Sequence, residues 1–219
     1  MNASDRLISF LPLIFIGLAA VISTRAFFID SSQSLKMFSR LCILTFVVEL
    51  VGHLTKETEV NYWIYNVFHV VYYIYLASIF YHTLKHDTVK SVIPVFYVTF
   101  FLFVVFNSLF LQGILSLQTY TLVLGGVFMM FLAGAYFWEL FVSNDNESIT
   151  RDPFFWFSFG FLLYFGGTVP FLGMFNYLST NFYDFTVFCY TNFSNAFSIL
   201  LSLLIMVGFL CRKSYQKLS

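Results

Sequence analysis

The segment from Thr119 to Val142 reads TYTLVLGGVFMMFLAGAYFWELFV, and its first charged side chain is Glu139. A helix that crosses the hydrocarbon core of a bilayer needs about 20 consecutive apolar residues. The segment meets that length, and it lacks the regular alternation of polar and apolar residues shown by the strands of a membrane barrel. Because backbone groups in lipid must be hydrogen-bonded within the protein, the segment is predicted to be a transmembrane α-helix.

Six further apolar segments of similar length follow one another along the chain, separated by short polar clusters. The sequence therefore predicts an all-α fold, a polytopic membrane helix bundle with seven transmembrane helices in a single domain covering residues 1–219. The predicted helices cover residues 7–28, 37–54, 61–81, 91–110, 119–142, 154–177 and 186–211. Pro94 fits the first turn of the fourth helix, where its missing N–H has no helical partner.

The composition agrees with a membrane protein and excludes several other classes. Only 10% of the residues are charged, against about 25% in a soluble domain, and the mean hydropathy is +0.82. The net charge is zero, so no attraction to nucleic acid is predicted. Cys42, Cys189 and Cys211 show neither disulfide nor metal-ligand spacing. We therefore expect no metal and no cofactor.

The distribution of Lys and Arg predicts the orientation, because short cytoplasmic loops carry an excess of these residues. Of the 11 Lys and Arg residues, two, Arg6 and Lys56, lie on one side of the seven segments. The nine on the other side are Arg25, Lys36, Arg40, Lys85, Lys90, Arg151, Arg212, Lys213 and Lys217. We therefore expect the N-terminus outside and the C-terminus in the cytoplasm, in a multi-pass protein of the inner (cytoplasmic) membrane.

Ionisable side chains inside the spans are candidates for a functional site, because keeping them in lipid is energetically costly. Glu49 and His53 lie four residues apart in the second span and so share one helix face. Counting inward from Arg40 at about 1.5 Å per residue places Glu49 roughly 13 Å deep. At this depth we expect Glu49 to carry a proton or to pair with a charged histidine.

The third span brings a second histidine to a similar depth. His69 lies about 12 Å below Asn61 at roughly 1.5 Å per residue. Tyr65, Asn66 and Tyr72 are three or four residues from His69 and share its broad face. These side chains are predicted to cluster with the carboxylate of the second span. The cluster is either a ligand or proton site, or a polar contact that only holds the two helices together.

The last span extends the candidate site with a stripe of polar side chains, Asn192, Ser194, Asn195, Ser198 and Ser202. Asn192 and Asn195 lie in the outer half of the span, at about the depth of the second-span carboxylate. In the sixth span, Pro170 frees a backbone carbonyl that can line a cavity. A ligand cavity and a helix–helix contact both fit this pattern.

A second surface is predicted at the cytoplasmic edge. Glu139 lies near the end of the fifth span, and Arg151 and Asp152 directly precede the sixth. We expect Glu139 to pair with Arg151 across the short connection. The alternative interpretation is a docking surface for a cytoplasmic partner, formed by the same three residues.

Two known seven-helix families lack the residues they need in this chain. Microbial rhodopsins bind retinal through a lysine of the last helix, and residues 186–211 contain no lysine. Zinc hydrolases of the ceramidase and progestin-receptor type need intramembrane histidines and an aspartate. No aspartate lies within a predicted span, so neither chemistry is expected.

Several aromatic-rich motifs occur in a characteristic order: Glu49-Leu50, NYWIYNVF at residues 61–68, NSLF at 107–110, and DPFFW at 152–156 followed by Gly160 and Tyr164. In this order they resemble a group of small bacterial seven-helix integral membrane proteins to which no function is assigned. Members of that group are often encoded beside sensor kinases. The resemblance therefore implies a signalling role with such a partner.

The leading functional hypothesis is a receptor-like or sensory protein that binds a small or lipophilic ligand, or a proton, in its outer half and signals to a separate partner. The alternatives are an accessory subunit of a membrane complex and a proton-linked transporter or channel. No nucleophile, metal set or pair of acids indicates an enzyme, and no catalytic residue is predicted. The expected partners are membrane lipid and a membrane or cytoplasmic protein such as a sensor kinase.

Overall fold

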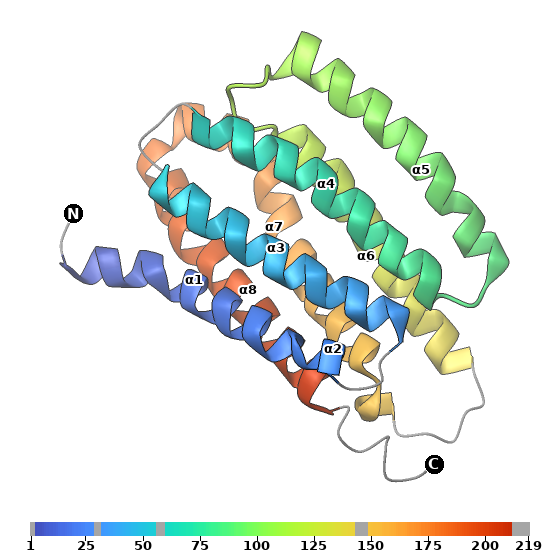
Figure 1. The fold of residues 1–219 in the computed structure, drawn as a ribbon. Helices are drawn as coiled ribbons and strands as arrows, with labels where there is room; N and C mark the ends of the chain where they lie inside the picture. Colours follow the sequence, from blue (N-terminus) through green and yellow to red (C-terminus); the bar gives the residue numbers. More distant parts are fainter. Residues whose placement is uncertain (1–2, 29–31, 56–59, 143–148, 212–219) are drawn as a thin grey trace.

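The structure, a computed structural model, describes residues 3–28, 32–55, 60–142 and 149–211 (Figure 1). These residues form helices and connections, with no strand among them. Seven segments are long and apolar enough to cross a membrane, which confirms the prediction of seven spans in a multi-pass, all-α membrane protein. They are Phe10–Phe28, Gln33–Leu54, Asn61–Thr83, Asp87–Leu111, Thr119–Val142, Pro153–Asn181 and Tyr183–Cys211.

The individual elements follow the predicted limits to within a few residues. They are α1 (Ala3–Ser23), α2 (Arg25–Phe28), α3 (Gln33–Leu54), α4 (Val60–Thr83), α5 (Asp87–Phe106), the π-helical turn η1 (Asn107–Leu111), α6 (Thr119–Val142), the 3-10 turn η2 (Ile149–Arg151), α7 (Pro153–Asn181) and α8 (Tyr183–Cys211). The fourth span consists of α5 continued by η1, with Pro94 inside the helix. It is therefore longer than the predicted 91–110.

The α7–α8 hairpin is tighter than the sequence analysis predicted. α7 continues to Asn181, and only Phe182 separates it from α8. Ser179, Thr180 and Asn181 each donate a side-chain hydrogen bond, 2.8–3.0 Å long, to a carbonyl three or four residues earlier. Because these polar groups are satisfied on the helix itself, polar residues continue the helix where a loop was expected.

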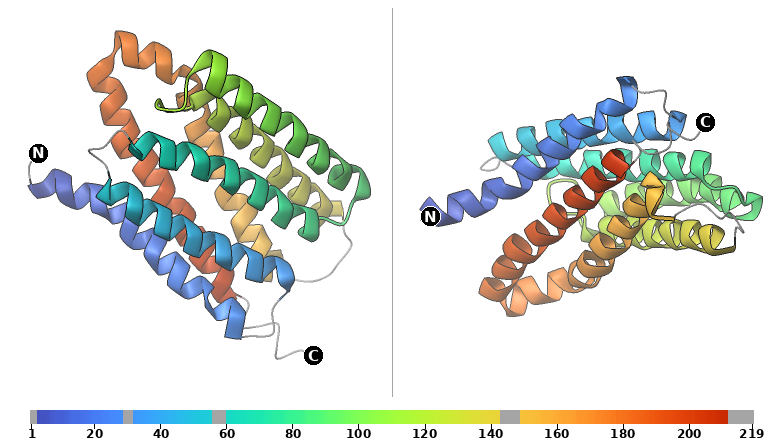
Figure 2. Two further views of the ribbon diagram at one scale, coloured as in Figure 1. Left: turned by 45° about the horizontal axis from the view of Figure 1, so that its top comes forward. Right: turned by 90° about the horizontal axis from the view of Figure 1, so that it is seen from below.

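Six of the long helices form a closed ring. Contacts between neighbours run in the order α1, α3, α4, α6, α7 and α8, and α8 returns to α1. α5 lies outside this ring, packed against α4 and α6 on the side opposite α1 (Figures 1 and 2). Faces of six helices therefore converge on the interior of the ring, and α5 contributes little to it.

One end of the ring interior is filled by aromatic side chains. Phe38 of α3 stacks on Phe157 of α7 with ring centroids 4.1 Å apart, and Phe209 of α8 lies 5.0 Å from Phe157. Phe161 of α7 contacts Phe38 as well, and all four side chains are buried. We call Phe38, Phe157, Phe161 and Phe209 the aromatic plug. It closes the interior at the end where α3 and α7 begin and α8 ends.

At the end of the bundle away from the aromatic plug, side-chain amides hold the first part of α4 in place. The amide nitrogen of Asn66 donates to the carbonyls of Ile114 and Ser116 at 2.9 and 2.8 Å, and its oxygen accepts from the backbone N–H of Gln118 at 3.3 Å. Gln118 in turn donates to the Ser108 hydroxyl at 2.7 Å. This network holds the connection between η1 and α6 against α4.

Candidate functional site

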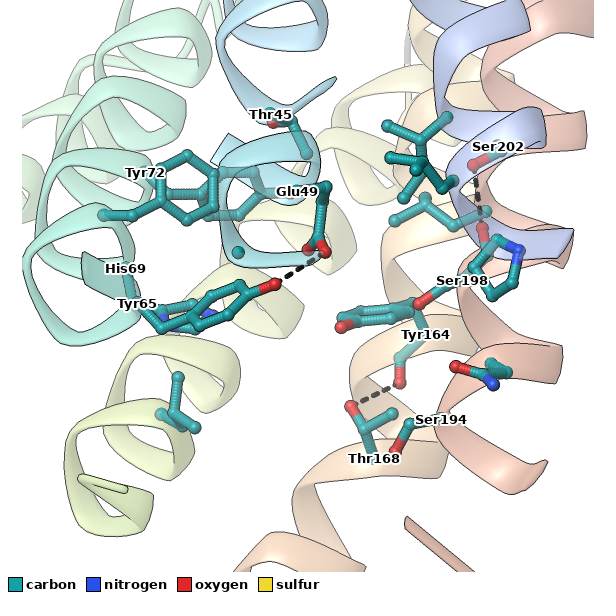
Figure 3. Close-up of a pocket in the computed structure, with 18 of the residues that line it drawn as sticks. Thr45, Glu49, Tyr65, His69, Tyr72, Tyr164, Thr168, Ser194, Ser198 and Ser202 are labelled. Carbon is teal, nitrogen blue, oxygen red and sulfur yellow. Dashed lines mark hydrogen bonds between the residues drawn. The ribbon is translucent and has the colours of Figure 1, made fainter. Parts of the chain in front are cut away.

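A cavity of about 500 Å³ lies inside the ring, between α1, α3, α4, α7 and α8, with Leu122 of α6 also in its wall (Figure 3). Phe38 of the aromatic plug lines it at one end, and Asn61 and Tyr62 at the start of α4 line it at the other. Apolar side chains from all five helices contribute to its wall. Tyrosines are its most frequent polar residues: Tyr62, Tyr65, Tyr72, Tyr73, Tyr164 and Tyr190.

Glu49 of α3 meets the first of these tyrosines across the α3–α4 pair. The Tyr65 hydroxyl donates a hydrogen bond of 2.9 Å to Oε2 of Glu49. Gly52 permits this approach, because a Cβ at that position would collide with the hydroxyl and ring of Tyr65. The amide of Asn61 donates to the Gly52 carbonyl at 2.7 Å and to the Thr55 hydroxyl at 3.2 Å. The two helices therefore present a carboxylate and a phenol to the cavity in a fixed arrangement.

Both histidines of the predicted cluster line the cavity. The His69 ring lies roughly parallel to those of Tyr65 and Tyr73, with centroids 6.1 and 6.4 Å away. Its Nδ1 atom is buried and has no hydrogen-bond partner among the described residues. His53 packs against Phe10 of α1 with ring centroids 4.2 Å apart. The first helix thus covers the His53 side of the cavity.

α7 and α8 form the opposite wall. Tyr164 of α7 and Tyr190 of α8 line the same cavity as Glu49. Ser198 of α8 lies beside Tyr164, and Figure 3 shows both side chains across the open space from Glu49. The carboxylate therefore faces phenols and hydroxyls from helices that are far from it in the sequence.

Of the eight predicted site residues, the structure brings six to this cavity: Glu49, His53, Tyr65, His69, Tyr72 and Asn195. Asn66 and Asn192 lie elsewhere. The Asn66 amide is engaged in the network that holds the η1–α6 connection. Asn192 is exposed on the outside of α8, and its amide donates to the Phe188 carbonyl of the same helix at 2.9 Å.

Sequence reasoning missed Tyr164 and Tyr190 as site residues. A signal for Tyr190 exists, because Ser194, Ser198 and Ser202 follow it at steps of four residues and so lie on the same helix face. For Tyr164 the signal is weaker. It belongs to a motif with many aromatic residues, and a single ring among many does not indicate which face turns inward.

The expected pairing of Glu139 with Arg151 is not formed in the described part of the chain. Both carboxylate oxygens of Glu139 instead accept backbone N–H groups, from Lys85 at 2.8 Å and from His86 at 2.7 Å. These two residues form the turn between α4 and α5. Glu139 therefore fastens the α4–α5 turn to the end of α6.

Asp152 has a structural position at the start of α7. Its Oδ1 accepts from the Phe154 N–H at 2.9 Å and so caps the helix, with Pro153 in the first turn. The Tyr136 hydroxyl of α6 donates to the other carboxylate oxygen. The α6–α7 pair is thereby held together at this end, next to the aromatic plug.

Comparison with known protein families, with curated proteins and with solved structures finds no match to this chain. The resemblance to small bacterial seven-helix membrane proteins therefore stays a prediction. What the protein does has to be inferred from the cavity and its lining.

Proposed function

We propose that the protein is a receptor-like membrane protein that binds a small or lipophilic ligand in the cavity and signals to a separate partner. The observation that carries this proposal is a closed helix ring around a cavity of about 500 Å³. Ligand sites commonly occupy about 300–1,000 Å³ and combine apolar walls with a few convergent polar groups. Glu49, Tyr65 and Tyr164 are such groups.

The distribution of Lys and Arg, nine against two, supports an N-terminus outside and a C-terminus in the cytoplasm of the inner membrane. In this orientation the aromatic plug lies toward the cytoplasm, and the cavity lies mainly in the outer half. The plug separates the cavity from the cytoplasmic side. This arrangement favours a receptor over a transporter, whose site must open to both sides.

Two helices connect the cavity with the plug. α7 carries Tyr164 in the cavity and, two turns earlier, Phe157 in the plug. α8 likewise carries Ser198 in the cavity and Phe209 in the plug. A ligand that moves Tyr164 away from Ser198 shifts both helices, and small helix shifts at packed interfaces are a common means of signalling. The partner would contact the cytoplasmic ends of α6 and α7.

A cavity-filling variant tests the ligand site. In Ser198→Phe the new ring occupies space opposite Glu49, whereas Ala196→Phe places the same ring at an exposed position of the same helix. The wild type and both variants are purified from native membranes, and the bound small molecules are identified by mass spectrometry. We expect one species to accompany the wild type and Ala196→Phe but not Ser198→Phe.

Two results would contradict the proposal. The first is equal recovery of every small molecule from all three proteins. The second is the absence of any bound molecule together with a stoichiometric complex with another membrane protein, which would favour an accessory subunit. Cross-linking in the native membrane before extraction identifies such a complex, and under the receptor proposal it also recovers the signalling partner.

A further inference from the structure

The charges that line the cavity restrict the class of ligand. Among the described residues of its wall, Glu49 is the one carboxylate, and neither Lys nor Arg is present. His53 and His69 are the basic side chains, and both already pack against aromatic rings. An anionic ligand would meet a carboxylate here without a fixed positive charge to offset it. The wall therefore disfavours ligands whose only charge is negative, such as fatty acids and inorganic phosphate.

The Glu49 carboxylate has acceptor capacity left for a ligand. A carboxylate offers about four lone-pair sites on two oxygens. Tyr65 donates to Oε2 at 2.9 Å, which leaves Oε1 as an acceptor. Figure 3 shows the carboxylate at the edge of the open space that separates Tyr65 from Tyr164. A donor group of a bound molecule in that space would reach it.

Tyrosine rings surround the same space. Tyr65 lies on one wall, hydrogen-bonded to Glu49, and Tyr164 of α7 and Tyr190 of α8 line the other. The faces of aromatic rings attract cations, and cages of such rings recognise ammonium groups, including fully methylated ones. A carboxylate among several tyrosines is therefore complementary to a positive group that is partly covered by methyl or methylene groups.

We propose that the cavity binds an organic ammonium ion with an apolar body, its cationic group held between Glu49 and the rings of Tyr65, Tyr164 and Tyr190. This inference rests on the proposed function and names the ligand class of the same site. An isolated charge is costly inside a membrane, and a cation paired with the carboxylate offsets the charge of both. The ligand completes an ion pair for which the protein supplies only one half.

The apolar body of the ligand has a matching surface. Leu41 of α3 and Leu201 and Ile205 of α8 line the cavity between the tyrosines and the aromatic plug. An alkyl or aromatic group placed there is removed from water and from the charged end. Two kinds of molecule share this chemistry, namely a free amphiphilic amine and a lipid with an ammonium headgroup. The test distinguishes them.

The test compares four probes that share a ten-carbon chain: decyltrimethylammonium, decylammonium, decanoate and decanol. Their binding to the purified full-length protein in a non-ionic detergent is measured by isothermal titration calorimetry. We expect both cations to bind. Decanoate and decanol should bind at least about tenfold more weakly than the cations, because neither supplies the positive member of the buried charge pair with Glu49. If a short-chain phosphatidylcholine displaces decyltrimethylammonium, the natural ligand is a lipid with an ammonium headgroup. If it does not, the natural ligand is a free amphiphilic amine.

Matched variants assign the effect to the proposed groups. Glu49→Gln keeps an oxygen that accepts from Tyr65 and should lower the affinity for the cations at least about tenfold. Asp184→Asn removes a negative charge from an exposed position at the start of α8, outside the cavity wall, and should leave the affinity unchanged. Tyr164→Phe keeps the ring and should bind nearly as well as wild type, whereas Tyr164→Leu should bind about fivefold more weakly.

The outcomes separate this inference from the proposed function. Binding of decanol or decanoate as strong as that of the cations, or no effect of Glu49→Gln, would overturn the ammonium proposal. If Ser198→Phe nevertheless abolished the binding of whichever probe bound, the cavity would remain a ligand site for another class of molecule. If no probe bound and Ser198→Phe changed nothing in the co-purified molecules, both proposals would be wrong.

Discussion

At the scale of single residues, Gly52 decides where the Glu49 side chain is held. A Cβ at this position would collide with the Tyr65 hydroxyl and ring, so Gly52→Ala should push Tyr65 away and break its hydrogen bond to Glu49. Overpacking of this kind costs about 1–3 kcal/mol. We expect the free energy of unfolding of the detergent-solubilised protein to fall by that amount, together with weaker binding of decyltrimethylammonium.

Gly134 on α6 provides the control for this prediction, since a Cβ added there meets nothing within 4 Å. Gly134→Ala should be neutral or slightly stabilising, because alanine favours a helix over glycine by up to about 1 kcal/mol. Equal destabilisation by both substitutions would show that loss of glycine flexibility matters, and not the contact with Tyr65.

Single residues also show how far the site can be predicted from the sequence. The pairing of Glu49 with the Tyr65 face was predictable, because the short α3–α4 connection makes the two helices antiparallel neighbours. Asn192 and Asn195 were predicted together because both lie in the outer half of the last span at about the depth of Glu49, yet only Asn195 lines the cavity. Which of two adjacent helix faces turns inward depends on the packing of neighbouring helices, and the local spacing does not contain that information.

At the scale of elements, the η1–α6 connection depends on one side chain of another helix. Asn66→Leu removes two part-buried hydrogen bonds to the carbonyls of Ile114 and Ser116 and one from the backbone N–H of Gln118. The free energy of unfolding should fall by about 2–4 kcal/mol. Amide hydrogen exchange should rise most in residues 112–118, which Asn66 holds.

Asn192→Leu is the matched control, because the Asn192 amide bonds only within its own helix and is exposed on the outside of α8. It should leave both the stability and the exchange of residues 112–118 nearly unchanged. Uniform exchange across the chain in Asn66→Leu would instead indicate global destabilisation and contradict a local role in the η1–α6 connection.

The helices themselves were predictable because the length of an apolar segment is a property of the sequence alone. The residues at which the helices begin and end were harder to predict. α7 extends to Asn181 since hydroxyl and amide side chains bond back to their own helix, and α3 begins at Gln33, before the predicted residue 37, with the Ser32 hydroxyl accepting from the Leu35 N–H. Polar residues near the membrane surface thus continued helices that hydropathy alone would end.

At the scale of the whole molecule, the closed ring could not be predicted from the order of the helices. α5 lies outside it although it is one of the most apolar segments, and α8 closes it by returning to α1. That closure brings Tyr164 and Tyr190 into the wall of the cavity that Glu49 also lines. The polar wall of the cavity is therefore a consequence of long-range packing, whereas its α3–α4 half follows from local connections.

The orientation of the ring in the membrane is the remaining whole-molecule prediction, because it decides whether the cavity is reached from outside. Two positions at opposite ends of the helix bundle test it: Asp184 at the start of α8 and Thr88 at the start of α5, both exposed. Asp184→Cys and Thr88→Cys are made separately in a protein whose three native cysteines are replaced by alanine, and intact cells are treated with a membrane-impermeant maleimide. We expect the cysteine at 184 to be labelled in intact cells and the cysteine at 88 only after permeabilisation, because the excess of Lys and Arg predicts that the basic end faces the cytoplasm. The reverse pattern would place the cavity in the inner half of the membrane, so that its ligand would have to enter from the cytoplasm or from the inner leaflet.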